Sequence, residues 1–152
     1  MTLKKLIKPA LMAVSFSLLL LNFGCSSDDD SIQSVEVTVN GTVLFDNGDD
    51  FNGDVDGDFT GNGGSGERVF IWQNSRPTAD YNADITSTSG GLFEMEVKDA
   101  NGNVVLNKSL TGGTEPDSFS GVTFTGTPGL WSVTITLSSF NGDGSFSLSE
   151  GD

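Results

Sequence analysis

The chain has 152 residues, with 21 acidic and 7 basic side chains, one cysteine, no histidine and a formal net charge of −14. So acidic a chain cannot neutralise phosphates, which excludes nucleic-acid binding as the default function. The missing histidine excludes Ser-His-Asp and Cys-His catalysis and histidine-ligated metals, so an enzyme would depend on carboxylates alone, as in glycoside hydrolysis.

The first 24 residues have the layout of a signal peptide. Lys4, Lys5 and Lys8 form a short basic start, and a nearly all-apolar core follows over residues 11–21. This core has the length of a signal-peptide core and is too short for a comfortable membrane span. We therefore expect residues 1–24 to be removed from the mature protein.

Cys25, the single cysteine, lies at the boundary between the apolar segment and an acidic one. The stretch Leu21-Asn22-Phe23-Gly24-Cys25 resembles a lipobox, the site cut by lipoprotein signal peptidase. The resemblance implies a thioether-linked diacylglycerol on Cys25 and an acyl chain such as palmitate on the new amino terminus. Several chains at one point give stable membrane anchoring. An uncleaved N-terminal anchor or ordinary secretion is the alternative.

A short polar run follows the cysteine: Ser26, Ser27, Asp28, Asp29 and Asp30. It resembles the export signal of Bacteroidetes lipoproteins, which carries them to the outer face of the outer membrane. That resemblance implies a lipid-anchored protein exposed on the cell surface, with the periplasmic leaflet as the alternative. A solvated acidic linker is compatible with both, and residues 25–33 are expected to form a lipidated tether.

Residues 34–152 are expected to form one domain with one core, because their number suits a single domain. Removal of the signal peptide takes away three lysines and no acid, so the net charge falls from −14 to −17. No second cysteine remains, so no internal disulfide can form, and stability must come from a packed core or a bound metal.

This domain alternates apolar and polar residues with the two-residue period of half-buried strands. The expected strands cover residues 35–39, 51–62, 68–72, 81–86, 93–97, 104–106, 118–125 and 130–137, and a last strand holds Phe146 and Leu148. Asp99 to Gly102 is predicted to be a tight hairpin turn, and Gly61 to Gly66 a flexible loop.

Eight or nine short strands, rich in valine, threonine and phenylalanine and with glycine at the turns, predict an all-β domain. An antiparallel β-sandwich of the jelly-roll or immunoglobulin-like type fits best, because a single sheet of this length would leave one face uncovered. A closed β-barrel is the alternative.

Residues 91–148 carry turn and core positions seen in small secreted sandwiches. The hairpin turn at Asp99 is followed by Pro-Gly-x-Trp-x-Val-x-Ile over 128–135 and by Gly-x-Phe-x-Leu over 144–148. This pattern resembles the C-terminal half of bacterial pre-peptidase C-terminal domains. The resemblance implies a sandwich fold and no particular activity.

The segment 46–58 is the densest in acids and holds the candidate metal ligands Asp46, Asp49, Asp50, Asp54, Asp56 and Asp58. Calcium takes six to eight oxygen ligands and would relieve the repulsion between carboxylates. An EF-hand is not expected, because Gly63 falls where its bidentate glutamate belongs. A looser calcium loop would use Asp46, Asp49 and Asp50. The competing interpretation is a strand with Phe51, Val55 and Phe59 on its packed face and acids on its solvated face.

Three aromatic residues are candidates for ligand binding: Trp72, Tyr81 and Trp131. Exposed rings on a sandwich face could stack against sugars, as in carbohydrate-binding modules. The competing interpretation is core packing, because both tryptophans lie within apolar strand patterns.

The sequence therefore predicts a non-enzymatic lipoprotein of the cell outer membrane. Its partners would be the membrane, through the anchor, and a glycan or a protein of a surface complex, in adhesion, glycan binding or an accessory role. Two alternatives stay open: a calcium-stabilised module, and a carboxylate-based enzyme acting on glycosides.

Overall fold

The computed structural model describes residues 32–152, and this part of the chain contains nine strands and no helix. The strands are β1 (Val35–Val39), β2 (Thr42–Val43), β3 (Asp49–Asn52), β4 (Val55–Asn74), β5 (Ala79–Thr86), β6 (Leu92–Lys98), β7 (Val104–Thr111), β8 (Ser118–Val122) and β9 (Gly129–Glu150). Accordingly, no helix able to cross a membrane is found in this part. The predicted signal peptide, lipidation site and export signal lie outside the described residues.

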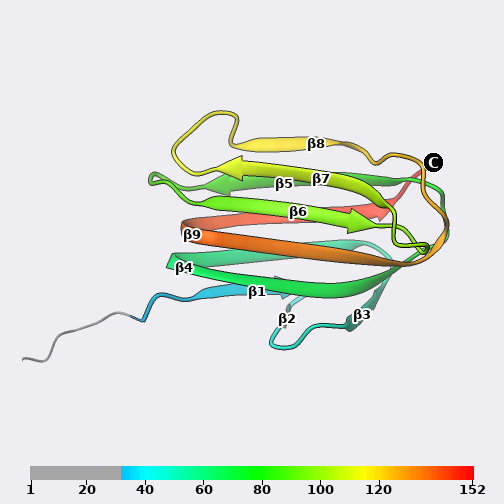
Figure 1. Ribbon diagram of the computed structural model, residues 1–152, viewed down its shortest axis with the longest axis horizontal. Coiled ribbons are helices and arrows are strands. Elements are labelled where there is room, and N and C mark those ends of the chain that lie inside the picture. Colours follow the sequence, from blue (N-terminus) through cyan, green and yellow to red (C-terminus); the bar gives the residue numbers. More distant parts are fainter. Residues whose placement is uncertain (1–31) are drawn as a thin grey trace, which may run out of the picture. The chain divides into compact units, whose positions relative to one another are not determined.

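Two long strands, β4 with 20 residues and β9 with 22, run antiparallel to each other along almost their whole length. Both bend near the middle, so each contributes one half to each layer of a sandwich (Figure 1). The first layer has the order β2-β1-β4-β9-β5-β8, using the first half of β4 and the second half of β9. The second layer has the order β3-β4-β9-β6-β7, using the other halves.

This order is that of a jelly roll. The bent strands count as four elements, and each layer then has a four-stranded centre in which a half of β4 pairs with a half of β9. The hydrogen-bonded order continues from β9 to β5 and β8 in one layer and to β6 and β7 in the other, as two Greek keys require. All pairs are antiparallel except β3 with β4. The predicted β-sandwich is confirmed, and the sheet is not closed into a barrel.

The bend in β4 corrects the predicted loop at Gly61–Gly66. These residues are part of the strand, and the register with β9 shifts twice, between Asn62 and Gly64 and between Gly64 and Gly66. Such bulges bend a strand without ending it. Glycine is needed here because a Cβ on Gly64 would lie 2.6 Å from the backbone of Ser34. The alternation of apolar and polar residues cannot show that the two strands expected over 51–62 and 68–72 form one continuous strand.

The acidic segment is also divided differently from the prediction. Residues 51–62 were expected to form one strand, but the chain turns at Gly53, which has φ of +77°. Phe51 belongs to β3 of the second layer, and Val55 begins β4 in the first layer. From there the expected faces are confirmed: Val55 and Phe59 are buried, and the aspartates between them are exposed.

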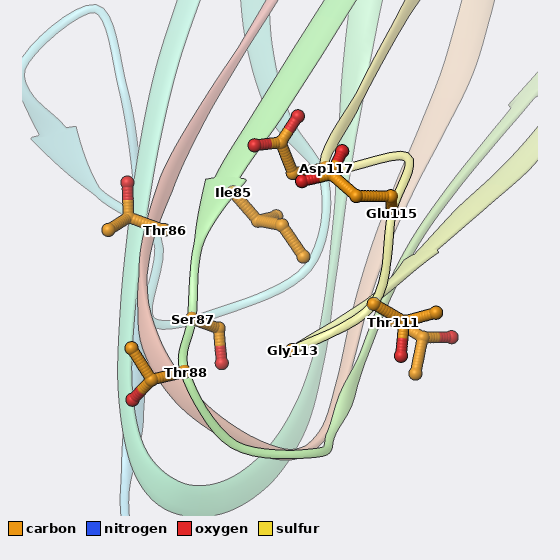
Figure 2. Close-up of a pocket in the computed structure, with 9 residues that line it drawn as sticks. Ile85, Thr86, Ser87, Thr88, Thr111, Gly113, Glu115 and Asp117 are labelled. Atoms are coloured by element: carbon orange, nitrogen blue, oxygen red, sulfur yellow. The ribbon is translucent and has the colours of Figure 1, made fainter.

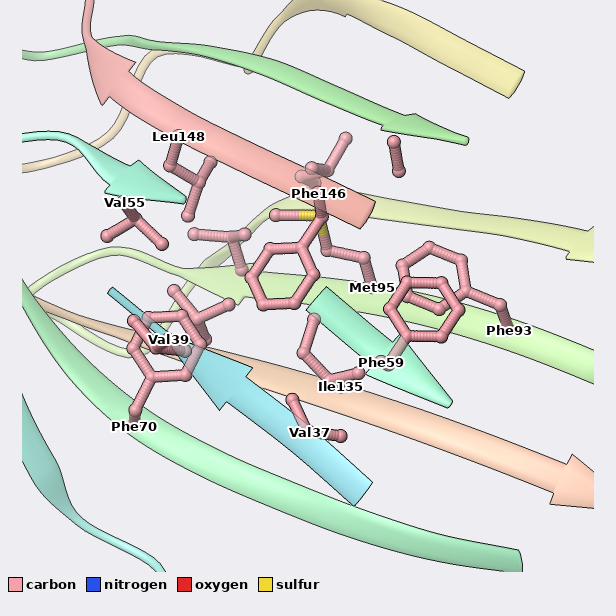
Figure 3. Close-up of a cluster of buried hydrophobic side chains, with 14 of the residues drawn as sticks. Val37, Val39, Val55, Phe59, Phe70, Phe93, Met95, Ile135, Phe146 and Leu148 are labelled. Atoms are coloured by element: carbon pink, nitrogen blue, oxygen red, sulfur yellow. The ribbon is translucent and has the colours of Figure 1, made fainter. Parts of the chain in front are cut away.

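Aromatic rings join the two layers in the core, which Figure 3 shows between β4, β9 and β6. The ring of Phe59 in the first layer stacks on Phe93 in the second, with centroids 4.4 Å apart and an interplanar angle of 4°. Phe70 and Phe146 face each other across the layers at 6.2 Å. Each fully buried side chain of this size contributes about 1.5–3 kcal/mol to stability, so these pairs hold the layers together.

Two glycine–phenylalanine pairs in the first layer make room for these rings. Gly57 lies opposite Phe146 in the β4–β9 register, and Phe59 lies opposite Gly144. A Cβ on Gly57 would be 2.1 Å from the ring of Phe146, and one on Gly144 would be 2.4 Å from the ring of Phe59. Each ring therefore covers the backbone of the opposite glycine, the close approach that inward-facing glycines permit.

Candidate functional site

Polar groups surround a hollow where β5 ends and the β7–β8 connection passes. A cavity of about 280 Å³ opens there, lined by Ile85, Thr86, Ser87, Thr88, Thr111, Gly113, Thr114, Glu115 and Asp117. Figure 2 shows Glu115 and Asp117 on one side, Ser87 and Thr88 on the opposite side and Ile85 between them. We call it the loop cavity.

Backbone hydrogen bonds hold the two walls of the loop cavity. Ile85 N donates to Asp117 O at 2.9 Å, and Gly113 N donates to Ser87 O at 2.9 Å. Gly112 allows the close contact next to Gly113, because a Cβ on Gly112 would be 2.2 Å from Ser89 O. The walls are thus tied at both ends, and the hollow between them is preformed.

The lining suits a ligand rich in hydroxyl groups. Glu115 and Asp117 present carboxylate acceptors, five threonine and serine hydroxyls can donate or accept, and Ile85 provides the one apolar side chain. No lysine or arginine lines the loop cavity, so nothing in it would balance the charge of an anion. Uncharged, polyhydroxylated molecules match this set of groups.

Sequence reasoning did not find the loop cavity. Residues 111–117, Thr-Gly-Gly-Thr-Glu-Pro-Asp, fall between two expected strands, and the sequence assigned them no role. The available signal was a pair of acids, Glu115 and Asp117, held in one connection that also contains two glycines. Their meeting with the end of β5 is a tertiary contact between segments about 30 residues apart, which no local pattern announces.

The tryptophans predicted as ligand-binding candidates lie in the core instead. Trp72 and Trp131 are both 0% exposed, and their rings meet edge to face at 6.0 Å. Each indole N–H is satisfied by a backbone carbonyl, Gly53 O at 2.7 Å and Thr127 O at 2.8 Å. This confirms core packing and rules out the sugar-stacking interpretation for both residues, because neither ring face is open to a ligand.

Tyr81, the third aromatic candidate, lies at the margin of the core. It is half-buried and makes an edge-to-face contact with Phe119 of β8 at 5.9 Å. The backbone of Gly121 covers its hydroxyl end, since a Cβ at that position would be 2.9 Å from the phenol oxygen. Tyr81 therefore fastens β8 to β5, and it does not line the loop cavity.

The six aspartates predicted as calcium ligands are all exposed and divided between segments. Asp49 and Asp50 belong to β3, Asp56 and Asp58 to the outer face of β4, and Asp46 and Asp54 to the connections before these strands. Within residues 32–152, no three acidic side chains gather as a group that could hold a metal ion. Calcium binding stays a prediction.

The most strongly perturbed carboxyl group belongs to Asp99, in the β6–β7 turn. Its Oδ2 accepts from Thr127 N at 2.9 Å, and its Oδ1 accepts from Asn103 N at 2.8 Å and Asn101 N at 3.0 Å. The hydrogen bond from Thr127 and those from the turn outweigh the effect of burial and lower the pKa of Asp99 to about 2. The carboxylate joins the turn to the segment that accepts the Trp131 indole, so its role is structural.

Asp99→Asn is expected to lower the melting temperature at pH 7, because an amide group cannot accept both sets of hydrogen bonds. A lowered pKa in the folded state means that the ionised carboxylate stabilises the fold above pH about 4. This stabilisation is lost as the pH falls from about 4 to about 2. Thermal denaturation from pH 7 to pH 2 should therefore show the two proteins converging below pH 4, and a constant difference would contradict the assignment.

Comparisons with known proteins identify no family for this chain. No protein-family model matches it, and no curated protein matches it. The solved structure of TmCBM61 in complex with beta-1,4-galactotriose is similar over 80% of this chain and 90% of that chain, with 13% identity and a TM-score of 0.37. At this level the likeness assigns neither a family nor a ligand to this chain.

Proposed function

We propose that the protein is a lipid-anchored protein of the outer membrane whose jelly-roll domain binds saccharides, without hydrolysing them, in the loop cavity. The lining of that cavity carries the proposal: hydroxyl groups and two carboxylates surround one apolar side chain, and no basic residue is among them. Carboxylate oxygens accept strong hydrogen bonds from sugar hydroxyls, and Ile85, which is 6% exposed, forms a small apolar floor beneath them.

The anchor is supported by the sequence around Cys25. An apolar core of signal-peptide length ends at residue 21, four positions before the cysteine, and five polar residues that resemble an export signal follow the cysteine. Acyl chains on Cys25 would hold the protein in the membrane while the domain stays in water. The acidic mature chain would stay soluble near the cell surface.

Saccharide binding is testable by titrating the purified full chain, in detergent, with a panel of neutral oligosaccharides. For a saccharide that binds, Glu115→Gln and Asp117→Asn are each expected to weaken binding about tenfold or more, because a hydrogen bond to a charged group is worth about 1.5–3 kcal/mol. Asp80→Asn is the matched control: Asp80 is exposed on β5 and does not line the loop cavity. Unchanged affinity in both cavity variants would place the ligand elsewhere.

One observation keeps an enzymatic alternative in view. Glu115 and Asp117 are two acids in one cavity, and a pair of carboxylates is what most glycoside hydrolases use. The same oligosaccharides should therefore be followed for the release of new reducing ends. We expect none, and release that disappears in Glu115→Gln or Asp117→Asn would replace binding by hydrolysis as the function.

A further inference from the structure

We propose that the loop cavity faces the membrane in which the protein is anchored, and that its ligand is a neutral saccharide carried by a lipid of that same membrane. This inference rests on the anchoring at Cys25 and the saccharide binding proposed above. It names the source of the ligand, which those two proposals leave open.

Asn62 in the bend of β4 holds the entering chain in place. Its Oδ1 accepts from Ser34 N at 2.6 Å, and its Nδ2 donates to Ile32 O at 3.1 Å. Its backbone N–H donates to Ser34 O at 3.2 Å. Three hydrogen bonds from one residue fix the direction in which residues 32–34 leave the sheet, beside the bend.

The loop cavity lies at this same end of the sandwich. Along the first layer, Val35 pairs with Gly61 of β4, and Gly61 pairs with Gly142 of β9. The hydroxyl of Ser87, in the cavity wall, lies 2.7 Å from Asn141 O of β9. The entering chain and the cavity are thus three strand spacings apart, about 15 Å. Figure 1 shows the start of β1 and the β5–β6 and β7–β8 connections together at one end, with the C terminus at the other.

The short tether limits how far this common end can lie from the membrane. Seven residue steps separate Cys25 from Ile32, and a fully extended chain of that length spans at most about 25 Å. The opposite end, with the β6–β7 turn, lies the length of β6, about 24 Å, from the end where the chain enters the domain. Under this proposal, the end of the sandwich that carries the loop cavity lies within reach of lipid head groups, and the end with the β6–β7 turn points away from them.

The acidic and hydroxyl side chains at this end of the sandwich favour uncharged lipid head groups over phosphate-bearing ones. The loop cavity holds Glu115 and Asp117, and Glu36 lines a second hollow of about 300 Å³ beside the entering chain. Neither hollow is lined by a basic residue. Phosphate-bearing head groups would be repelled, whereas the hydroxyls of an uncharged sugar can pair with the carboxylates and threonines. A neutral glycolipid is the head group that fits.

The orientation can be measured by energy transfer from the protein to a dye on the vesicle surface. Cys25 is the single cysteine and is acylated under the proposal, so an introduced cysteine provides a unique thiol. Gly90→Cys labels the cavity end, where a Cβ meets nothing within 4 Å, and Ala100→Cys labels the exposed β6–β7 turn at the other end. The lipidated full chain would be reconstituted in phosphatidylcholine vesicles with a head-group acceptor.

We expect transfer from the Gly90→Cys label to exceed that from the Ala100→Cys label about twofold or more, because the two ends differ in height by about 24 Å. Equal or reversed transfer would overturn the orientation, whatever the cavity binds. Circular dichroism and the melting temperature of both labelled proteins would show that each is folded. Absence of transfer from both labels would mean that the anchor itself is missing.

The ligand source is tested separately, by the melting temperature of the reconstituted protein. Vesicles containing neutral galactosyl or glucosyl diacylglycerol are expected to raise it by roughly 5–10 °C at saturation over plain phosphatidylcholine, with a clearly smaller rise in Glu115→Gln. Stabilisation by a soluble oligosaccharide but not by either glycolipid would overturn this inference and leave saccharide binding intact. No stabilisation by any saccharide would overturn the proposed function as well.

Discussion

Gly57→Ala is expected to destabilise the domain by about 3 kcal/mol and to lower its melting temperature by roughly 10 °C. The added Cβ would lie 2.1 Å from the ring of Phe146, which is 2% exposed and packs against Phe59 and Phe70. The ring cannot move away from Gly57, because the side chains of the second layer, such as Phe70, pack against its other side. The methyl group therefore has to push β4 away from β9 or displace the aromatic cluster.

A matched control and a rescue make this prediction specific. Gly90→Ala introduces the same methyl group where nothing lies within 4 Å, so denaturant melts should show a change below about 0.5 kcal/mol. Combining Gly57→Ala with Phe146→Leu should cost less than the sum of the two changes, because the smaller side chain leaves room for the methyl group. Additive losses would show that the Gly57–Phe146 contact is not what limits the site.

Cys25→Ala is expected to abolish membrane anchoring. Without the thiol there is no thioether to diacylglycerol. The mature chain has a net charge of −17, because the three lysines of residues 1–24 are lost from a chain of net charge −14. Its acidic tether offers no other source of membrane affinity. Metabolic labelling with palmitate, followed by fractionation of cells, should show label and membrane association in the parent and neither in the variant.

Ser26→Ala, next to the cysteine, is the control for this experiment, because it changes the tether by one atom and keeps the thiol. It should retain both lipid and membrane association. Mass spectrometry of the parent should show an acylated N terminus at residue 25. A membrane-bound parent with an unmodified Cys25 would mean that residues 1–24 remain attached as an uncleaved anchor, the alternative that the sequence leaves open.

Much of the fold follows from local pattern. The alternation at Val35, Val37 and Val39 predicted β1, and Asp99 to Gly102 predicted the turn that joins β6 to β7, where Gly102 has φ of +82°. Period-two alternation and turn residues act over a few neighbours, so a sequence displays them directly. The sandwich itself followed from counting such strands.

The parts that could not be predicted depend on contacts between distant segments. Gly61 to Gly66 looks like a loop because six residues with four glycines have low strand propensity. Pairing with β9 keeps them in a strand, and their lack of side chains lets it bend. The core positions of Trp72 and Trp131, by contrast, agree with the core packing that their apolar strand patterns indicated, and the pairing of β4 with β9 places the two residues opposite each other.

By itself, the sequence determined three things about this protein: an all-β domain, the residues that alternate toward its core, and a lipobox-like address at Cys25, which stays a prediction. Each depends on residues that are close together in the sequence, so a short segment is enough to predict it. Only the tertiary structure decided how β4 and β9 pass through both layers, and that Glu115 and Asp117 meet the end of β5 around a cavity. It also placed that cavity at the end where the chain enters. These features depend on pairings between residues 26 to 93 positions apart, such as Ser87 with Gly113 and Val55 with Leu148, and these pairings stabilise the fold only when the whole core closes.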